Sequence, residues 1–169
     1  MTETIAEILD AYHSGAATPA DIVARSYTRI RAHDDPAMFI ALRDETAVMA
    51  EAQSLAGGDK TLPLYGIPVA VKDNIDVAGM PTTAACPAFA YRPATDATAV
   101  ARLRAAGALL LGKLNLDQFA TGLVGTRSPY GTPRNLFDAR LIPGGSSSGS
   151  GVAVGAGIVP LTLGTDTAG

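Results

Sequence analysis

The chain has 169 residues, of which 47% are hydrophobic and 17% are charged. This composition excludes a disordered chain, and the length suits a single globular domain. The formal net charge is −3 and no basic stripe is present, which argues against nucleic acid as a direct partner.

Two helices are predicted at the N-terminus, within residues 1–35. The first has apolar residues at helical spacing and a glycine, Gly15, at its end. The second begins with the run Thr-Pro-Ala-Asp at 18–21, which combines a threonine cap, a proline in the first helical position and an acid in the third. His13 and His33 fall near the two helix ends, where we interpret them as surface residues or partners of the helix dipole.

Residues 36–169 alternate between apolar strands and helices. The predicted order is a strand at 38–42, a helix at 44–55, a strand at 67–72, a helix at 96–106 and a strand at 109–112. The repeated order of helix, glycine and strand predicts an α/β domain with a mixed β-sheet flanked by helices. Residues 122–145 are dominated by loop, and loops of this length are more often functional than inert.

The composition also predicts a cytoplasmic protein without a membrane partner. The most apolar stretch, Val152–Leu163, is too short to cross a bilayer and is interrupted by two glycines and a proline. The N-terminus lacks the basic and apolar regions of a signal peptide. The single cysteine, Cys86, excludes an internal disulfide, and we interpret it as a small buried hydrophobe because no histidine lies near it in the sequence.

Lys72 is the first candidate for chemistry, because it ends a strand that is predicted to be buried. On one interpretation its ammonium group reaches water or pairs with Asp73 or Asp76. On the other it is desolvated, which disfavours the charged form and leaves an amine that can act as a general base near pH 7. The second interpretation requires a neighbouring group with which the amine exchanges its proton.

A serine-rich turn at 144–150, Gly-Gly-Ser-Ser-Ser-Gly-Ser, is the second candidate. It is a flexible loop or helix cap on one interpretation, and an anion site at the start of a helix on the other. The P-loop and dinucleotide-binding patterns do not fit, because the required lysine and third glycine are missing. Ser147 fits the pattern Gly-x-Ser-x-Gly by its letters alone, since no strand directly precedes it and both histidines lie upstream.

A second glycine-rich turn, Gly164–Gly169, follows a helix-like stretch and a short apolar strand. Glycine lets the backbone approach a ligand closely, so the two turns together suggest the floor of an active site. We interpret Asp166, which lies between two threonines, as a residue that braces this turn through backbone hydrogen bonds.

Four segments in chain order resemble the amidase signature family over essentially the whole chain. They are residues 66–73, which include Gly-Ile-Pro and Val-Lys-Asp, residues 112–115, residues 144–147 and residues 164–169. The resemblance implies an amidase-signature α/β fold. Residues 1–169 would form the N-terminal part of a single amidase domain, with a helical region at 1–35 and a signature core at 36–169 that is incomplete at its C-terminal end.

The resemblance also implies a Ser–Ser–Lys triad with no cofactor and no metal ion. Lys72 matches the base, and Ser146 matches the bridging serine, which in the family follows a cis peptide bond. The nucleophilic serine would come directly after Gly169, so residues 1–169 alone are expected to be inactive. The backbone N–H groups of Thr167, Ala168 and Gly169 would form the oxyanion hole.

Two segments, 82–89 and 117–131, resemble the allophanate hydrolase group of this family. The substrate would then be allophanate, a small anion hydrolysed with release of ammonia in urea degradation, and Gly122 would offer it a main-chain contact. We interpret Arg127 as a solvated or structural residue. Three alternatives stay open: a general amidase, a glutamyl-tRNA amidotransferase-type subunit, and a non-catalytic module that binds an anion or nucleotide. A homodimer and an association with urea-degrading enzymes are also left open.

Overall fold

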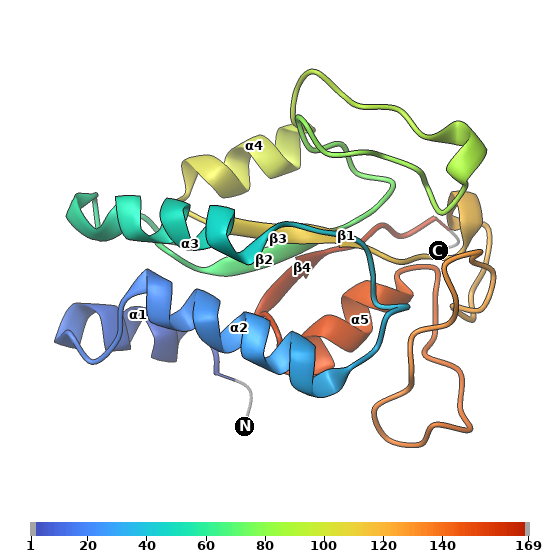
Figure 1. Ribbon diagram of the computed structural model, residues 1–169, viewed down its shortest axis with the longest axis horizontal. Helices are drawn as coiled ribbons and strands as arrows, with labels where there is room; N and C mark the ends of the chain where they lie inside the picture. Colours follow the sequence, from blue (N-terminus) through green and yellow to red (C-terminus); the bar gives the residue numbers. More distant parts are fainter. Residues whose placement is uncertain (1–2, 168–169) are drawn as a thin grey trace.

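The chain begins with two helices (Figure 1). They are capped in the same way. In this computed structural model, which describes residues 3–167, they are α1 (Ile5–Ser14) and α2 (Pro19–His33). Each follows a threonine whose hydroxyl accepts a hydrogen bond from the third helical residue, and the acid there bonds back to the threonine N–H. Gly15 ends α1 with a φ of 77°, a left-handed conformation that glycine adopts readily. Both predicted helices are confirmed.

Four strands form one mixed sheet in the order β1-β3-β2-β4. The strands are β1 (Phe39–Leu42), β2 (Pro68–Lys72), β3 (Leu109–Leu114) and β4 (Leu161–Leu163). β3 pairs antiparallel with β1 and parallel with β2, while β2 also pairs parallel with β4. The predicted strand at 109–112 continues to Leu114, because Lys113 and Leu114 pair with Val71 and Lys72. The predicted mixed sheet is confirmed.

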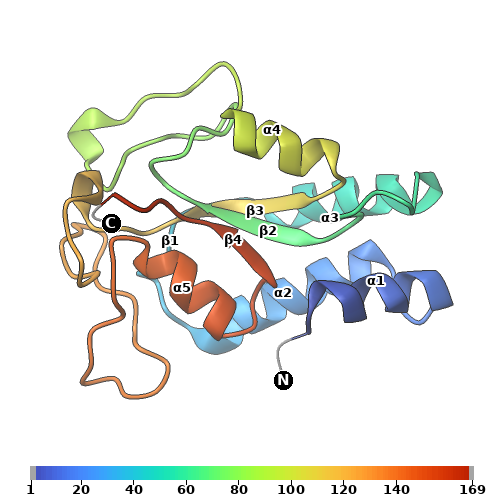
Figure 2. The same ribbon diagram turned by 180° about the vertical axis from the view of Figure 1, so that it is seen from behind.

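Helices cover both faces of the two central strands (Figure 2). The remaining helices are α3 (Glu45–Ser54), α4 (Thr98–Ala105) and α5 (Ser148–Gly155), with short 3-10 turns at Leu55–Gly57, Pro87–Phe89 and Gln118–Ala120. Val71 packs in one cluster with Val100 of α4, and Ala70 packs in another with Val152 of α5. Every residue of β2 and β3 is therefore buried, as the apolar runs predict. Within residues 3–167, no helix is long and apolar enough to cross a membrane.

The C-terminal ends of β2, β3 and β4 lie at one edge of the sheet, because these three strands are parallel. The long connections that follow β2 and β3, together with the segment that follows β4, gather at this end of the molecule (Figures 1 and 2). Residues 121–147 contain no helix or strand, which agrees with the predicted loop. In sheets of this kind, ligands bind outside the carboxyl ends of the strands.

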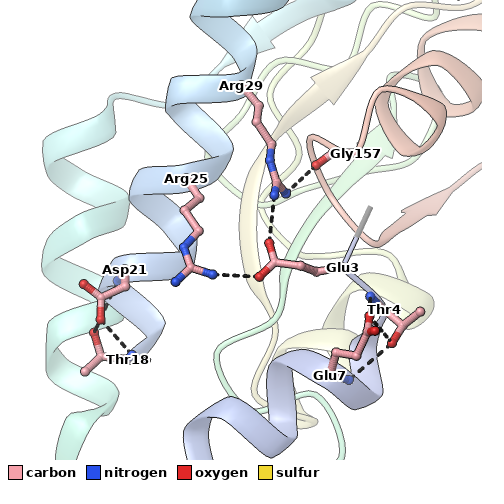
Figure 3. Close-up of polar contacts among 8 residues, drawn as sticks. All are labelled: Glu3, Thr4, Glu7, Thr18, Asp21, Arg25, Arg29 and Gly157. Atoms are coloured by element: carbon pink, nitrogen blue, oxygen red, sulfur yellow. Dashed lines mark hydrogen bonds and ion pairs between the residues drawn. The ribbon is translucent and has the colours of Figure 1, made fainter. Parts of the chain in front are cut away.

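At the opposite end, α2 holds the N-terminal segment and the end of α5 (Figure 3). Glu3 pairs with Arg25 at 2.7 Å and with Arg29 at 2.8 Å. Arg29 also donates to the carbonyl oxygen of Gly157 at 2.7 Å. A single guanidinium therefore joins three parts of the chain.

We expect Arg29→Met to lower the free energy of unfolding by about 1 kcal/mol, because it removes a charge-assisted hydrogen bond as well as an ion pair. Arg25→Met is the matched control. It removes only the exposed pair with Glu3 and is expected to cost less than about 0.5 kcal/mol. Urea unfolding of both variants measures the difference, and equal losses would show that the bond to Gly157 contributes nothing.

Candidate active site

Lys72 connects the two glycine-rich turns. It is the last residue of β2, and its side chain is 0% exposed. Its Nζ donates to Ser146 Oγ at 2.7 Å and to Thr165 Oγ1 at 2.7 Å. The interpretation of a lysine that reaches water is therefore wrong, and the serine hydroxyl is the neighbouring group that a desolvated lysine requires.

Burial changes the acidity of this lysine. Loss of water around the ammonium group lowers the pKa of Lys72 from 10.5 to about 8. The carboxylate of Asp117 opposes this change, because a negative charge favours the ammonium form. With a pKa of about 8, roughly a tenth of the Lys72 side chains are neutral at pH 7. Lys72 can therefore accept a proton near neutral pH, which is what a general base requires.

Ser146 lies two residues before the start of α5, next to the N-cap residue Ser147, and is 7% exposed. The Gly145–Ser146 peptide bond is cis, as the family resemblance implies. The Ser146 carbonyl oxygen accepts hydrogen bonds from the N–H of Asp117 at 3.0 Å and of Ser148 at 3.1 Å. Ser147 is placed differently, since its hydroxyl exchanges hydrogen bonds of 3.3 Å with the backbone of Thr165. The hydroxyl that meets Lys72 is thus that of Ser146.

A cavity of about 240 Å³ opens between the two turns. Its lining residues are Leu123, Gly145, Ser146, Ser147, Thr165, Asp166 and Thr167. Thr167 is held there by a hydrogen bond of 2.9 Å from its hydroxyl to the Ala120 carbonyl oxygen. Ala168 and Gly169, the other two residues predicted for the oxyanion hole, lie outside the described residues.

A larger hollow of about 430 Å³ lies between α5 and residues 135–143. Its lining contains no titratable side chain, so it offers no group that could move a proton. Elsewhere in residues 3–167, no three His, Cys, Asp or Glu side chains gather in a way that could hold a metal ion. We therefore place the candidate site at the smaller cavity, where Lys72 and Ser146 meet.

Gly122 is close to this site but serves a structural need. A Cβ at Gly122 would lie 2.4 Å from Cγ of the buried Asp117, so no other residue fits without a shift. Its neighbour Leu123 lines the cavity, whereas Gly122 is not among the lining residues. The main-chain contact between Gly122 and a substrate stays a prediction. The Arg127 guanidinium is exposed, in agreement with its interpretation as a solvated residue.

Thr165, Asn74 and Asp117 are not among the site residues predicted from the sequence. Thr165 Oγ1 accepts hydrogen bonds from Lys72 and, at 3.2 Å, from Asn74 Nδ2. The position of Thr165 directly after Gly164, in the second glycine-rich turn, is the sequence feature from which its place in the site could have been predicted. Asp117 gave no such signal, because its carboxylate accepts hydrogen bonds from the backbone N–H groups of Gly125 and Arg127.

Asn115 supports the loop that begins after β3. Its Nδ2 donates to the carbonyl oxygens of Ala37 at 2.8 Å and of Gly131 at 3.0 Å. Its Oδ1 accepts from the N–H of Leu116 and from the hydroxyl of Ser128. A buried amide with every group satisfied fixes these distant segments in one arrangement.

Asp73, which follows Lys72 directly in the sequence, belongs to a buried ion pair. Lys113 Nζ and Asp73 Oδ1 are 2.9 Å apart, and both side chains are 0% exposed. Burial lowers the pKa of Lys113, while the carboxylate of Asp73 opposes that change. Lys113 also donates to Pro81 O and Thr82 Oγ1, and Asp73 Oδ2 accepts from the Thr83 N–H at 2.9 Å. The pair thus fastens residues 81–83 to the sheet, and Asp73 is not the partner of Lys72.

Comparison with known proteins gives the same fold and family. A family model described as Amidase matches residues 21–169. The chain is 58% identical over 140 residues to the urea amidolyase of Lachancea kluyveri, which covers 82% of this chain and 8% of that protein. It is 52% identical over 126 residues to a glutamyl-tRNA(Gln) amidotransferase subunit of Symbiobacterium thermophilum, covering 74% of this chain and 26% of that protein.

The solved structure of Kluyveromyces lactis allophanate hydrolase superimposes with a TM-score of 0.84 at 46% identity, over 99% of this chain and 28% of that one. The chain therefore spans between 8% and 28% of the length of these three relatives. The family model and these identities cover most of the chain. The chain thus belongs to the amidase signature family.

Proposed function

We propose that the chain is the N-terminal part of an amidase domain that hydrolyses allophanate and releases ammonia. Lys72 is the general base and Ser146 is the bridge through which the proton moves. The observation that carries this proposal is the buried hydrogen bond of 2.7 Å between Lys72 Nζ and Ser146 Oγ. A lysine whose pKa is lowered to about 8 and whose hydroxyl partner faces a cavity supports proton transfer near neutral pH.

The family resemblance supplies the nucleophile, a serine directly after Gly169, which lies outside residues 1–169. As its hydroxyl oxygen attacks the amide carbonyl, its proton passes to Ser146 Oγ while the Ser146 proton passes to neutral Lys72. The backbone N–H groups of Thr167, Ala168 and Gly169 stabilise the oxyanion. The proton then returns through Ser146 to the leaving nitrogen, ammonia departs, and water hydrolyses the remaining ester.

Allophanate is favoured as substrate by the similarity to urea amidolyase and to allophanate hydrolase. An amidotransferase-type subunit is the second candidate, because the chain is also similar to a glutamyl-tRNA(Gln) amidotransferase component. A general amidase is the third.

A substrate panel tests this proposal. In a protein that continues these residues through a complete amidase domain, we expect ammonia release from allophanate to exceed that from simple carboxamides and from glutamine by at least about 100-fold in kcat/KM. Residues 1–169 alone are expected to release none. A preference for glutamine would establish the second candidate instead, and ammonia release by residues 1–169 alone would refute the position of the nucleophile.

A further inference from the structure

We propose that Asp117 is a positioning residue of this site, whose carboxylate holds the loop 122–127 and the Gly145–Ser146 peptide in place around Lys72. Its effect on catalysis rests on the function proposed above. Its effect on the protonation of Lys72 does not rest on that function, because it depends only on the charge and geometry of the folded chain.

Asp117 joins three segments through one residue. Its side chain is 0% exposed, and its two oxygens accept hydrogen bonds from Gly125 N–H at 2.9 Å and Arg127 N–H at 2.8 Å. Its own N–H donates to the Ser146 carbonyl oxygen at 3.0 Å. A hydrogen bond to a carboxylate is stronger than one between neutral groups, so this arrangement fixes the loop and the bridging serine relative to each other.

The glycines of both segments are placed so that the backbone can close around this carboxylate. A Cβ at Gly122 would lie 2.4 Å from Asp117 Cγ, and a Cβ at Gly145 would lie 2.2 Å from Asp117 Oδ2. Both distances are shorter than van der Waals contact between such atoms. A Cβ at Gly145 would also lie 2.5 Å from the backbone nitrogen of Gly125, so the glycine before the bridging serine is required both by Asp117 and by the loop that Asp117 holds.

The charge of Asp117 also acts on Lys72. The groups that contact the Lys72 amine, Ser146 and Thr165, are neutral hydroxyls. Asp73 and Lys113 neutralise each other in their ion pair. The hydrogen-bond partners of the Asp117 carboxylate are neutral amides, so its negative charge stays uncompensated and favours the ammonium form of Lys72.

Two other acidic residues belong to the segments around this site. Asp166 lies in the second turn and lines the cavity, and Asp76 follows β2 and accepts a hydrogen bond from the Tyr91 hydroxyl. Asp76 is a suitable control position, because its carboxylate faces Tyr91 while it is only four residues from Lys72 in the sequence.

NMR titration of residues 1–169 with lysine labelled at Cε tests the inference without any need for catalysis. We expect Asp117→Asn to move the Lys72 titration to lower pH by roughly 0.5 to 1 unit, and Asp76→Asn to move it by less than about 0.2 unit. An unchanged Lys72 titration in folded Asp117→Asn would overturn the inference. Because this measurement does not depend on turnover, it tests the role of Asp117 separately from the proposed allophanate activity.

Amide exchange in the unmodified chain gives a second measurement that needs no variant. The N–H groups of Gly125 and Arg127 are expected to exchange at least about 100-fold more slowly than the exposed loop amides around residue 139. Exchange as fast as in that loop would show that Asp117 does not hold these groups in solution. This outcome would overturn the positioning role even if Asp117→Asn failed to fold.

Discussion

Replacing Lys72 with methionine is expected to lower kcat for amide hydrolysis by at least roughly 10³-fold, in a protein that continues these residues through a complete amidase domain. Methionine keeps an unbranched side chain that is one atom shorter, and it removes the amine that meets Ser146 Oγ at 2.7 Å. Ser146→Ala interrupts the same proton path and is expected to have an effect of similar size. Because the two residues act as a unit, the double variant should lose little more than either single one.

The pH dependence gives this prediction a direction. Only the neutral amine accepts a proton, so kcat/KM should rise with pH and level off above about 8, the pKa to which burial lowers Lys72. Lys60→Met, at an exposed lysine, is the control and should leave both the rate and the profile unchanged. A non-catalytic binding module would instead bind its ligand equally well after Lys72→Met and Ser146→Ala.

The same substitution separates catalysis from folding. Since the pKa of Lys72 is lowered from 10.5 to about 8 in the folded chain, the unfolded chain binds more protons between these pH values. Stability of the unmodified chain relative to Lys72→Met should therefore rise across that window, by up to roughly 3 kcal/mol. Lys72→Met should be folded and should lack this rise, and urea unfolding at pH 7 and pH 10 measures both.

Much of the scaffold could be predicted from the sequence because its signals are local. The two threonine caps fix where α1 and α2 begin, and runs of apolar residues identify the buried strands β2 and β3. The contact between Lys72 and Ser146 could be predicted for a different reason. Each residue lies in a recognisable motif, and the family resemblance links the two motifs.

The partner of Asp73 could not be predicted from sequence proximity, because successive side chains along a strand point to opposite faces. Asp73 follows Lys72 directly and so points away from it. Val71 lies beside Lys113 in the register of β2 and β3, which puts Lys113 on the face toward which Asp73 points. The pairing therefore depends on strand register, which the sequence alone did not provide.

The loop between β3 and α5 was predicted as a loop, but its path could not be. Its course is set by hydrogen bonds from Asn115 to Ala37 and Gly131 and from Asp117 to backbone N–H groups. Backbone partners carry no side-chain signature, so no pattern of residue types reveals them. The three-dimensional arrangement was needed to show why Gly122 and Gly145 are glycines.

Of the substitutions considered, those that break the ion pair between Lys113 and Asp73 are expected to lower the free energy of unfolding the most. Lys113→Met leaves the Asp73 carboxylate at a site that is 0% exposed, without its charged partner, and should lower the free energy of unfolding by roughly 3–5 kcal/mol. Adding Asp73→Asn removes the stranded charge while keeping an oxygen that can accept the Thr83 N–H. The double variant should therefore recover more than half of the loss.

The exposed ion pair of Arg31 with Glu45 provides the control, because Arg31→Met should cost less than about 0.5 kcal/mol. Urea unfolding of the four proteins at pH 7 measures these differences. If Lys113→Met cost no more than Arg31→Met, Asp73 would have to be protonated or hydrated in the fold, and the pair would not be ionic. If the double variant were less stable than Lys113→Met, the hydrogen bonds to Thr83 would outweigh the stranded charge.

The pair should affect the candidate site as well, because its contacts continue to the cavity. Asp73 O accepts from Ala84 N–H, and Ala84 O in turn accepts from Phe119 N–H. The next residue, Ala120, accepts the hydroxyl hydrogen bond of Thr167 at the cavity wall. Loosening of residues 82–85 would thus displace Thr167, so Lys113→Met should lower kcat even at temperatures where the protein remains folded. The double variant Lys113→Met/Asp73→Asn removes the unpaired charge but does not restore the contacts of Lys113 with residues 81–82. It should therefore recover a larger share of the lost stability than of the lost kcat.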